Sequence, residues 1–215
     1  MIDLRGVSKD YPVRHGRYRV LDRVDLTVRP GERVGILGRN GAGKSTLIRL
    51  ISGAELPTSG TIQRSMSVSW PLAFSGAFQG SLTGLDNLRF VCRVYDQTFR
   101  DKVAFVEEFS ELGRFLREPV KSYSNGMAAR LAFAISMAIE FDCFLIDEIV
   151  AVGDDRFRHR CEVELFEKRG HRAMVFVSHD PRFIRDHCQR AAVLKNGELT
   201  SFENLDDAFA CHEQT

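Results

Sequence analysis

A glycine-rich segment, Gly38–Thr46, carries the clearest chemistry in this chain. Its residues have the G-x-x-x-x-G-K-[ST] spacing of a loop that binds phosphate groups. Glycines let successive backbone N–H groups turn toward one point, because no Cβ atom stands in the way, and these groups form a nest for an anion. We expect Lys44 to reach the β- and γ-phosphates of a nucleotide and Ser45 to give an oxygen to Mg²⁺.

The residues on either side predict the structure that such a loop needs. The apolar run Arg33–Leu37 before the loop is typical of a buried parallel strand. After the loop, Leu47, Ile48, Leu50 and Ile51 recur at helical spacing, and the positive end of that helix would point at the same anion. The competing interpretation, a glycine-rich turn with a solvated lysine, does not account for the strand and the helix.

Three polar residues follow two further apolar segments. Asp147 and Glu148 come directly after Cys143–Ile146, and His179 comes soon after Ala173–Val177. Because parallel strands that end at one sheet edge converge on the ligand crevice, we expect these side chains near the phosphate loop. Asp147 would hold Mg²⁺, directly or through water, Glu148 would polarise an attacking water as general base, and His179 would donate to the γ-phosphate. The alternatives are a carboxylate that caps the next turn and a structural histidine.

Three more positions have two interpretations each. Gln79, between glycines, would ligate Mg²⁺ or orient water through its carbonyl oxygen, or be a solvated loop residue. Tyr11, in a predicted polar turn beside a proline, would stack on adenine or only pack. Ser124 is a good helix N-cap, and a helix N-terminus at Ser124–Gly126 is also an anion site. One nucleotide can use that second site only if two chains face each other.

The remaining pattern predicts a single α/β domain over residues 1–215. Residues 2–7 alternate like an edge strand, residues 20–28 alternate as well, and residues 191–199 form a hairpin that turns at an Asn-Gly pair. Between them, apolar residues at helical spacing predict a helical insert at about 85–140.

Composition limits the class of protein. In 215 residues, 44% are hydrophobic and 27% are charged, which is ordinary for a globular protein. The 30 lysines and arginines nearly balance the 29 aspartates and glutamates, so no bulk charge favours nucleic acid. The five cysteines form no C-x-x-C pair, which indicates free thiols in a reducing compartment. No segment reads as a signal peptide or a membrane span, so we expect the chain itself to be cytosolic.

Together these residues resemble the ATP-binding subunit of an ABC transporter over nearly the whole chain. The motifs that carry the resemblance are an aromatic loop (Tyr11), Walker A (Gly38, Arg39, Asn40, Gly41, Ala42, Gly43, Lys44, Ser45, Thr46), a Q-loop (Gln79), a signature (Tyr123–Met127), Walker B (Cys143–Asp147), a catalytic glutamate (Glu148), a D-loop (Ala151–Asp154) and a switch histidine (His179). The resemblance implies a P-loop NTPase fold: a mixed-sheet core with an antiparallel β subdomain and a helical subdomain. It implies ATP and Mg²⁺ as ligands, with Ser45, Gln79 and Asp147 at the metal.

The resemblance also implies an assembly and a subgroup. Two chains would form a head-to-tail homodimer that sandwiches two ATPs, each between one chain's loop and the other chain's Ser124 and Gly126. Two motifs depart from the commonest family pattern: Asn125 replaces a glycine of the signature, and the D-loop reads Ala-Val-Gly-Asp up to Asp154. Asn125 puts a side chain where the backbone would approach phosphate. Both departures resemble the exporters of bacterial surface polysaccharides, and Ser69–Pro71 and Phe78–Gly84 favour capsular polysaccharide.

The expected partners are ABC-2-type transmembrane permease subunits and the polysaccharide export machinery, at the cytoplasmic face of the bacterial inner membrane. Export of O-antigen or teichoic acid is the alternative cargo. A soluble ABC ATPase acting on ribosomes or DNA would be expected to have a second ATP module, a long coiled coil or a basic stripe, and the sequence has none of these. A small-molecule kinase would not explain Gln79, the signature and His179.

Overall fold

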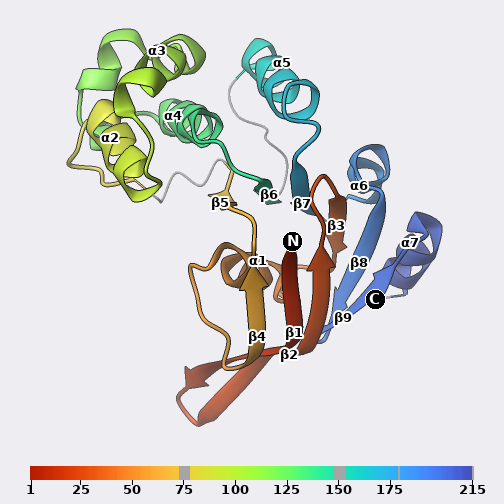
Figure 1. Cartoon of the computed structure of the whole chain (residues 1–215). Helices are drawn as coiled ribbons and strands as arrows, with labels where there is room; N and C mark the ends of the chain where they lie inside the picture. Colours follow the sequence, from red (N-terminus) through yellow and green to blue (C-terminus); the bar gives the residue numbers. More distant parts are fainter. Residues whose placement is uncertain (73–77, 148–153, 179, 215) are drawn as a thin grey trace. The chain divides into compact units, whose positions relative to one another are not determined.

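The computed structural model describes residues 1–72, 78–147, 154–178 and 180–214 (Figure 1). The chain divides into two compact units, and each is described by itself. The first consists of Met1–Pro71, Phe141–Ile149 and His171–Thr215, and the second of Leu72–Glu140 and Val150–Gly170. The predicted helical insert at 85–140 falls inside the second unit. The prediction of a single domain over the whole chain stays a prediction.

A three-stranded antiparallel sheet in the first unit contains β1 (Ile2–Val13), β2 (Gly16–Val28) and β4 (Ser59–Arg64), in the order β2-β1-β4. The prediction that residues 2–7 form an edge strand was therefore wrong, because β1 pairs on both sides. Alternation reveals that one face is buried, but it does not reveal how many strands lie beside it.

Tyr11 does not lie in the predicted turn but on β1, where it pairs with Tyr18 of β2. Pro12 is compatible with this because it lies near the turn that joins β1 to β2, where β1 has β2 as its partner and the pairing with β4 has ended.

The second sheet of the first unit has six strands in the order β5-β6-β7-β3-β8-β9. Their bounds are β5 (Val68–Pro71), β6 (Cys143–Asp147), β7 (Ala173–Val177), β3 (Arg33–Leu37), β8 (Arg190–Lys195) and β9 (Glu198–Phe202). The first five run parallel, and β9 pairs antiparallel with β8. The predicted hairpin at residues 191–199 is confirmed: Asn196 and Gly197 both have positive φ, 52° and 84°, as the tight turn of a hairpin requires.

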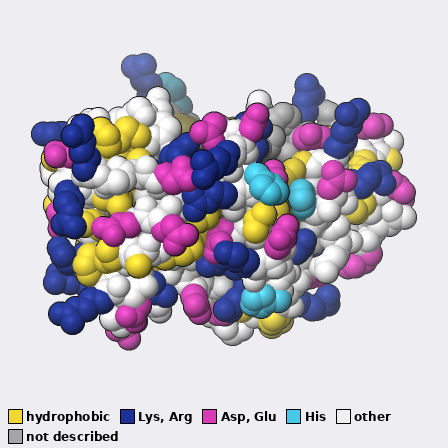
Figure 2. Space-filling model, turned by 90° about the horizontal axis from the view of Figure 1, so that it is seen from above, with side chains coloured by type: hydrophobic (Ala, Val, Ile, Leu, Met, Phe, Trp, Pro, Cys, Tyr) yellow, Lys and Arg dark blue, Asp and Glu magenta, His cyan; other side chains and the backbone are white. Residues whose placement is uncertain are grey.

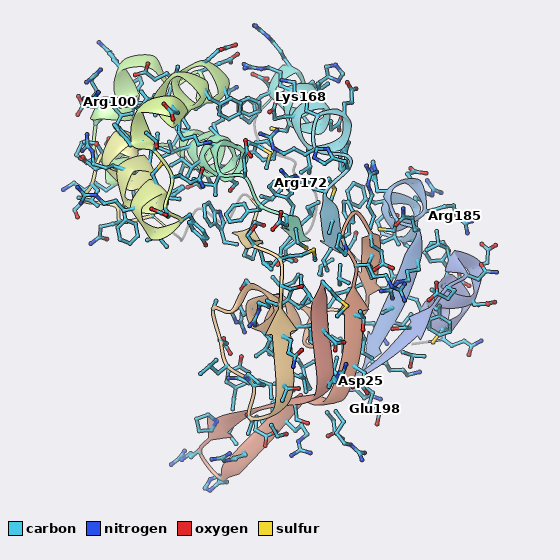
Figure 3. The ribbon with its side chains drawn as sticks, in the orientation of Figure 1. Asp25, Arg100, Lys168, Arg172, Arg185 and Glu198 are labelled. Carbon is cyan, nitrogen blue, oxygen red and sulfur yellow. The ribbon has the colours of Figure 1, made fainter. Side chains whose placement is uncertain are left out.

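Three helices accompany these sheets: α1 (Lys44–Ser52), α6 (Pro181–His187) and α7 (Leu205–Glu213). Apolar residues of both sheets and of α1 share one buried core. Arg185, labelled in Figure 3, holds α7 to α6, because its Nη2 lies 2.5 Å from Asp206 and its guanidinium lies 4.7 Å from the ring centre of Phe209.

A buried ion pair ties the two sheets together. The Nε atom of Arg190, at the start of β8, donates to Glu32 at 2.7 Å, and its Nη2 donates to the Thr27 carbonyl of β2. Only 8% of the Arg190 side chain and 12% of the Glu32 side chain are exposed, so solvent screens this pair weakly.

The second unit is helical, as predicted. It contains α2 (Gly84–Val94), α3 (Phe99–Ser110), α4 (Asn125–Ala138) and α5 (Asp155–Glu162), which continues as a π-helix over Val163–Glu167; short 3-10 turns span Gly113–Arg117 and Val120–Ser122. Phe109 of α3 stacks on Phe133 of α4 and meets Phe157 of α5 edge-on, with ring centres 5.7 and 5.5 Å apart. These aromatic contacts hold the three helices together.

The surface carries mixed charge. Figure 2 shows lysines and arginines interspersed with aspartates and glutamates across the face in view. Among the described residues, no helix has both the length and the apolar character that a membrane crossing requires.

Candidate nucleotide-binding site

The loop between β3 and α1 needs its glycines. Gly41 and Gly43 have φ values of 83° and 105°, a region that side chains strongly disfavour. A Cβ atom on Gly43 would lie 2.9 Å from Val20 Cγ1, and one on Gly38 would lie 2.7 Å from the carbonyl oxygen of Leu194. The backbone of the loop therefore packs closely against Val20 of β2 and Leu194 of β8.

Lys44 opens helix α1 and is buried, with 8% of its surface exposed. Its Nζ donates to the carbonyl oxygens of Gly38 at 2.6 Å and Arg39 at 3.1 Å. The first turn of α1 contains no acidic residue, so nothing within it offsets the positive helix end. The ammonium group and the helix end thus create positive potential around the loop.

A cavity of about 560 Å³ adjoins this loop. It is lined by Val20, Asp147 and six loop residues between Asn40 and Thr46, among them Ser45. Asp147 reaches the cavity because β6 and β3 flank β7 in register: Asp147 pairs with Val177, which pairs with Ile36. The sequence-based expectation that Asp147 lies near the loop is confirmed.

The cavity contains the groups that a magnesium-bound nucleotide needs. Ser45 and Asp147 offer a hydroxyl and a carboxylate oxygen to one space, and hard oxygen ligands of this kind suit Mg²⁺. Backbone N–H groups and the Lys44 ammonium suit the phosphates beside it. The residues present therefore fit MgATP, although the role of each stays a prediction.

Tyr11 connects to the cavity through side chains of α1 and the segment after it. Its hydroxyl donates to Glu55 at 2.6 Å, and Arg49 Nη2 donates to the same hydroxyl at 3.2 Å. Arg49 also donates to Thr46 Oγ1, at 3.2 Å, and Thr46 lines the cavity. The half-buried tyrosine is thus two hydrogen bonds from the phosphate loop, and its stacking on adenine stays a prediction.

The second unit holds the predicted signature and Gln79. Ser124 caps α4, as expected, because its Oγ accepts from the Met127 N–H at 3.2 Å, and Ser124–Gly126 are exposed. Gln79 is exposed, and two hydrogen bonds between its backbone and the Asn87 side chain, of 3.0 and 3.2 Å, hold it in place. Since Ser45 and Asp147 belong to the first unit, a metal contact by Gln79 stays a prediction.

Asp154, the last residue of the predicted D-loop, caps α5 through its Oδ1, which accepts from the Phe157 N–H at 2.9 Å. Its Oδ2 lies 3.0 Å from Arg130 of α4, and Arg130 also pairs with Glu111 at 3.1 Å. Glu148, Ala151–Gly153 and His179 lie outside the described residues. The catalytic roles assigned to Glu148 and His179 therefore stay predictions.

Sequence reasoning missed three residues of this site: Val20, Arg49 and Glu55. Arg49 follows Thr46 by three positions, a helical spacing that puts the two side chains together, so this contact had a local signal. Val20 comes to the site on strand β2, and Glu55 comes to it in the turn after α1. No spacing pattern in the neighbouring sequence predicts either contact.

Comparison with known proteins assigns the family. The family model described as "ABC transporter" matches residues 21–151, which is more than half of the chain. The chain belongs to the ABC transporter family. This membership confirms the sequence-based interpretation of the chain as an ABC-type ATPase.

Curated relatives match over the whole length of this ABC protein. The ATP-binding protein BexA of Haemophilus influenzae is 58% identical, covering 100% of this chain and 99% of the relative. The capsule polysaccharide export ATP-binding protein CtrD of Neisseria meningitidis serogroup B is 59% identical, covering 97% of each. The polysialic acid transport ATP-binding protein KpsT of Escherichia coli is 42% identical, covering 100% and 99%.

A solved structure shows the same fold. The dimeric, post-hydrolysis state of the ATP-binding cassette MJ0796, bound to ADP and Pi, matches with a TM-score of 0.78 and 23% identity, covering 94% of this chain and 98% of that one. The predicted ABC cassette fold is confirmed.

Proposed function

We propose that this chain is the ATP-hydrolysing subunit of an ABC exporter that drives capsular polysaccharide across the bacterial inner membrane. The observation that carries the proposal is the 59% identity to CtrD, which is named for capsule polysaccharide export, over 97% of both chains. Relatives named for teichoic acid export are more distant: TagH of Staphylococcus haemolyticus is 35% identical and extends further, since the match covers 88% of it. Capsular polysaccharide is therefore favoured over teichoic acid.

The side chains of the site would suit the binding and hydrolysis of ATP with Mg²⁺. Gly38–Thr46 would hold the phosphates, with Ser45 and Asp147 at Mg²⁺, whose charge would offset that of the phosphate oxygens. Lys44, a buried cation at the start of α1, would lie beside the same oxygens. Glu148 would polarise the attacking water, and His179 would donate a hydrogen bond to the γ-phosphate. In-line hydrolysis needs both of these roles.

The assembly belongs to the proposal as well. In a homodimer, the exposed N-terminus of α4 at Ser124–Gly126 would bind the triphosphate that the partner's phosphate loop holds. The matched MJ0796 cassette is a dimer in its solved structure. ABC-2-type permease subunits would anchor the pair at the cytoplasmic face of the membrane, where the export machinery would receive the polysaccharide.

The experiment replaces the chromosomal gene with the Glu148→Gln variant and measures polysaccharide on the surface and inside the cell. Because this change removes the predicted base and keeps the side-chain size, we expect loss from the surface with accumulation inside. Glu107→Gln, at an exposed position of α3, is the matched control and should export normally. Unchanged polysaccharide in both fractions, with the variant expressed and no second gene copy present, would refute the assignment of cargo.

A further inference from the structure

Tyr11 and three side chains around it form a cluster, and the family motifs account for none of these three. We name it the Tyr11 clamp; it consists of Lys9, Tyr11, Arg49 and Glu55. Glu55 is its hub, because its Oε2 accepts from the Tyr11 hydroxyl at 2.6 Å and lies 3.3 Å from Lys9, while its Oε1 accepts from Arg49 Nε at 2.6 Å. Three donors thus converge on one half-buried carboxylate.

The ionisation of Glu55 favours the hydrogen bonds that it accepts. Burial alone would raise the pKa of Glu55, but the hydrogen bonds from Tyr11, Arg49 and Lys9 outweigh it, so this pKa lies below its ordinary value. Glu55 is therefore ionised at neutral pH, and a charged acceptor binds a hydroxyl more strongly than a neutral one does. The tyrosine ring is consequently held at its hydroxyl end.

Lys9 covers one side of the ring. Its Nζ lies 5.1 Å from the ring centre and also donates to the Leu56 carbonyl at 2.8 Å. One face of the aromatic ring is therefore taken by a cation. A planar base can stack only on the opposite face.

Arg49 joins the ring to the phosphate loop. Its Nη2 donates both to the Tyr11 hydroxyl and to Thr46 Oγ1, each at 3.2 Å, while Nε holds Glu55. A guanidinium group is planar and rigid, so these three contacts fix the distance between the ring and the loop. A nucleotide needs such a fixed distance, because its base and its phosphates are covalently joined.

From these contacts we infer that Glu55 and Arg49 are positioning residues that hold Tyr11 as the base platform at a fixed distance from Thr46. The inference rests on the proposed nucleotide-binding function and adds two residues to it. Pre-organisation of this kind raises affinity, since the ring is already ordered before the base arrives. The clamp should therefore strengthen binding of a nucleotide and leave binding of a bare phosphate chain unchanged.

The test compares two ligands with the same phosphate chain, ADP and inorganic pyrophosphate, by calorimetric titration with Mg²⁺. Tyr11→Phe keeps the ring and removes the tethering hydroxyl, and Glu55→Ala removes the hub. We expect each to weaken ADP binding by about twofold to tenfold, as the loss of a hydrogen bond predicts, and to leave pyrophosphate affinity unchanged. The double variant should be no weaker than Glu55→Ala, because both changes release the same ring.

Glu107→Ala, an exposed change on α3, is the matched control and should bind both ligands as the unmodified chain does. Thermal unfolding of every variant checks that the fold is intact. The inference is overturned if the unmodified chain binds pyrophosphate as tightly as ADP, or if Tyr11→Phe and Glu55→Ala leave ADP affinity unchanged. It is also overturned if both ligands weaken equally, because the clamp would then act on the phosphate loop. A chain that binds neither ligand would contradict the proposed function itself.

Discussion

Ser124 has two roles that a single substitution can separate. As the N-cap of α4 it accepts a hydrogen bond from Met127, and as a residue of an exposed helix N-terminus it would face the partner's triphosphate. Aspartate caps helices about as well as serine does, but it would put a negative charge where phosphate is expected.

We therefore predict that Ser124→Asp folds normally, within about 0.5 kcal/mol of the parent chain, and fails to form an ATP-dependent dimer. Light scattering with ATP, in chains that also carry Glu148→Gln, measures the dimer, and denaturant titration measures stability. Ser201→Asp, at an exposed position of β9, controls for the added charge. A dimer that forms equally well with Ser124→Asp would exclude this helix end from the nucleotide site.

At the scale of elements, Arg130 of α4 adds polar contacts to the aromatic packing between α4 and α5. Arg130 pairs with Asp154 and Glu111, and its guanidinium lies 4.6 Å from the ring centre of Phe157. Only 19% of the Arg130 side chain is exposed. A cation with two carboxylates and an aromatic face around it contributes more than an isolated surface pair does.

Arg130→Met keeps an apolar stem over Phe157 and removes both ion pairs. We predict a loss of about 1–2 kcal/mol in the free energy of unfolding, or roughly 2–8 °C in the melting temperature of a chain of this size. Arg100→Met, at an exposed position of α3 labelled in Figure 3, is the control and should leave the melting temperature nearly unchanged. Equal melting temperatures for the two variants would show that the Arg130 contacts do not stabilise the second unit.

The Glu32–Arg190 ion pair in the first unit predicts that the folding stability depends on pH. Burial raises the pKa of Glu32, but hydrogen bonds from Arg190 and from the Arg29 N–H outweigh it and hold this pKa below its ordinary value. The ionised form is thus favoured in the folded chain. Its stabilising contribution is complete above the ordinary glutamate pKa of about 4.3 and disappears as the pH falls through the lower, folded value.

We accordingly expect Glu32→Gln to be less stable than the parent chain at neutral pH, with a difference that shrinks as the solution is acidified below about pH 4.3. Urea titrations of both chains at a series of pH values measure it. Glu107→Gln, at an exposed position of α3, is the matched control for the change of side chain. A difference between Glu32→Gln and its parent that is constant across this range would mean that Glu32 is not the titrating group.

At the scale of the whole molecule, the features that depend on neighbouring residues were predicted from the sequence. The features that depend on contacts between distant segments were not. The phosphate loop, the strand that leads to Asp147 and the Asn196–Gly197 turn depend on neighbouring residues, and all three were found. The central place of β1 depends on its pairing with β4, and the Tyr11 hydroxyl bonds to Glu55, which lies 44 residues further along the chain; no periodicity encodes either contact. Residues that carry chemistry are thus easier to find than the residues that position them.

The proposed two-chain site makes the last prediction, because Lys44 and Ser124 would serve one nucleotide from different chains. Lys44→Ala and Ser124→Asp should each abolish ATP hydrolysis alone. In a mixture of the two, a mixed dimer has one site with both residues intact, so we predict recovered hydrolysis, about a quarter of the parent rate if pairing is random and each site works alone.

The reverse mixture combines the parent chain with an excess of the double variant Lys44→Ala/Ser124→Asp. Its mixed dimers have no intact site, so the mixture should lose activity. If the site lay within one chain, the first mixture would stay inactive and the second would keep the activity of the parent chain. Phosphate release from both mixtures therefore decides whether one chain or two build the site.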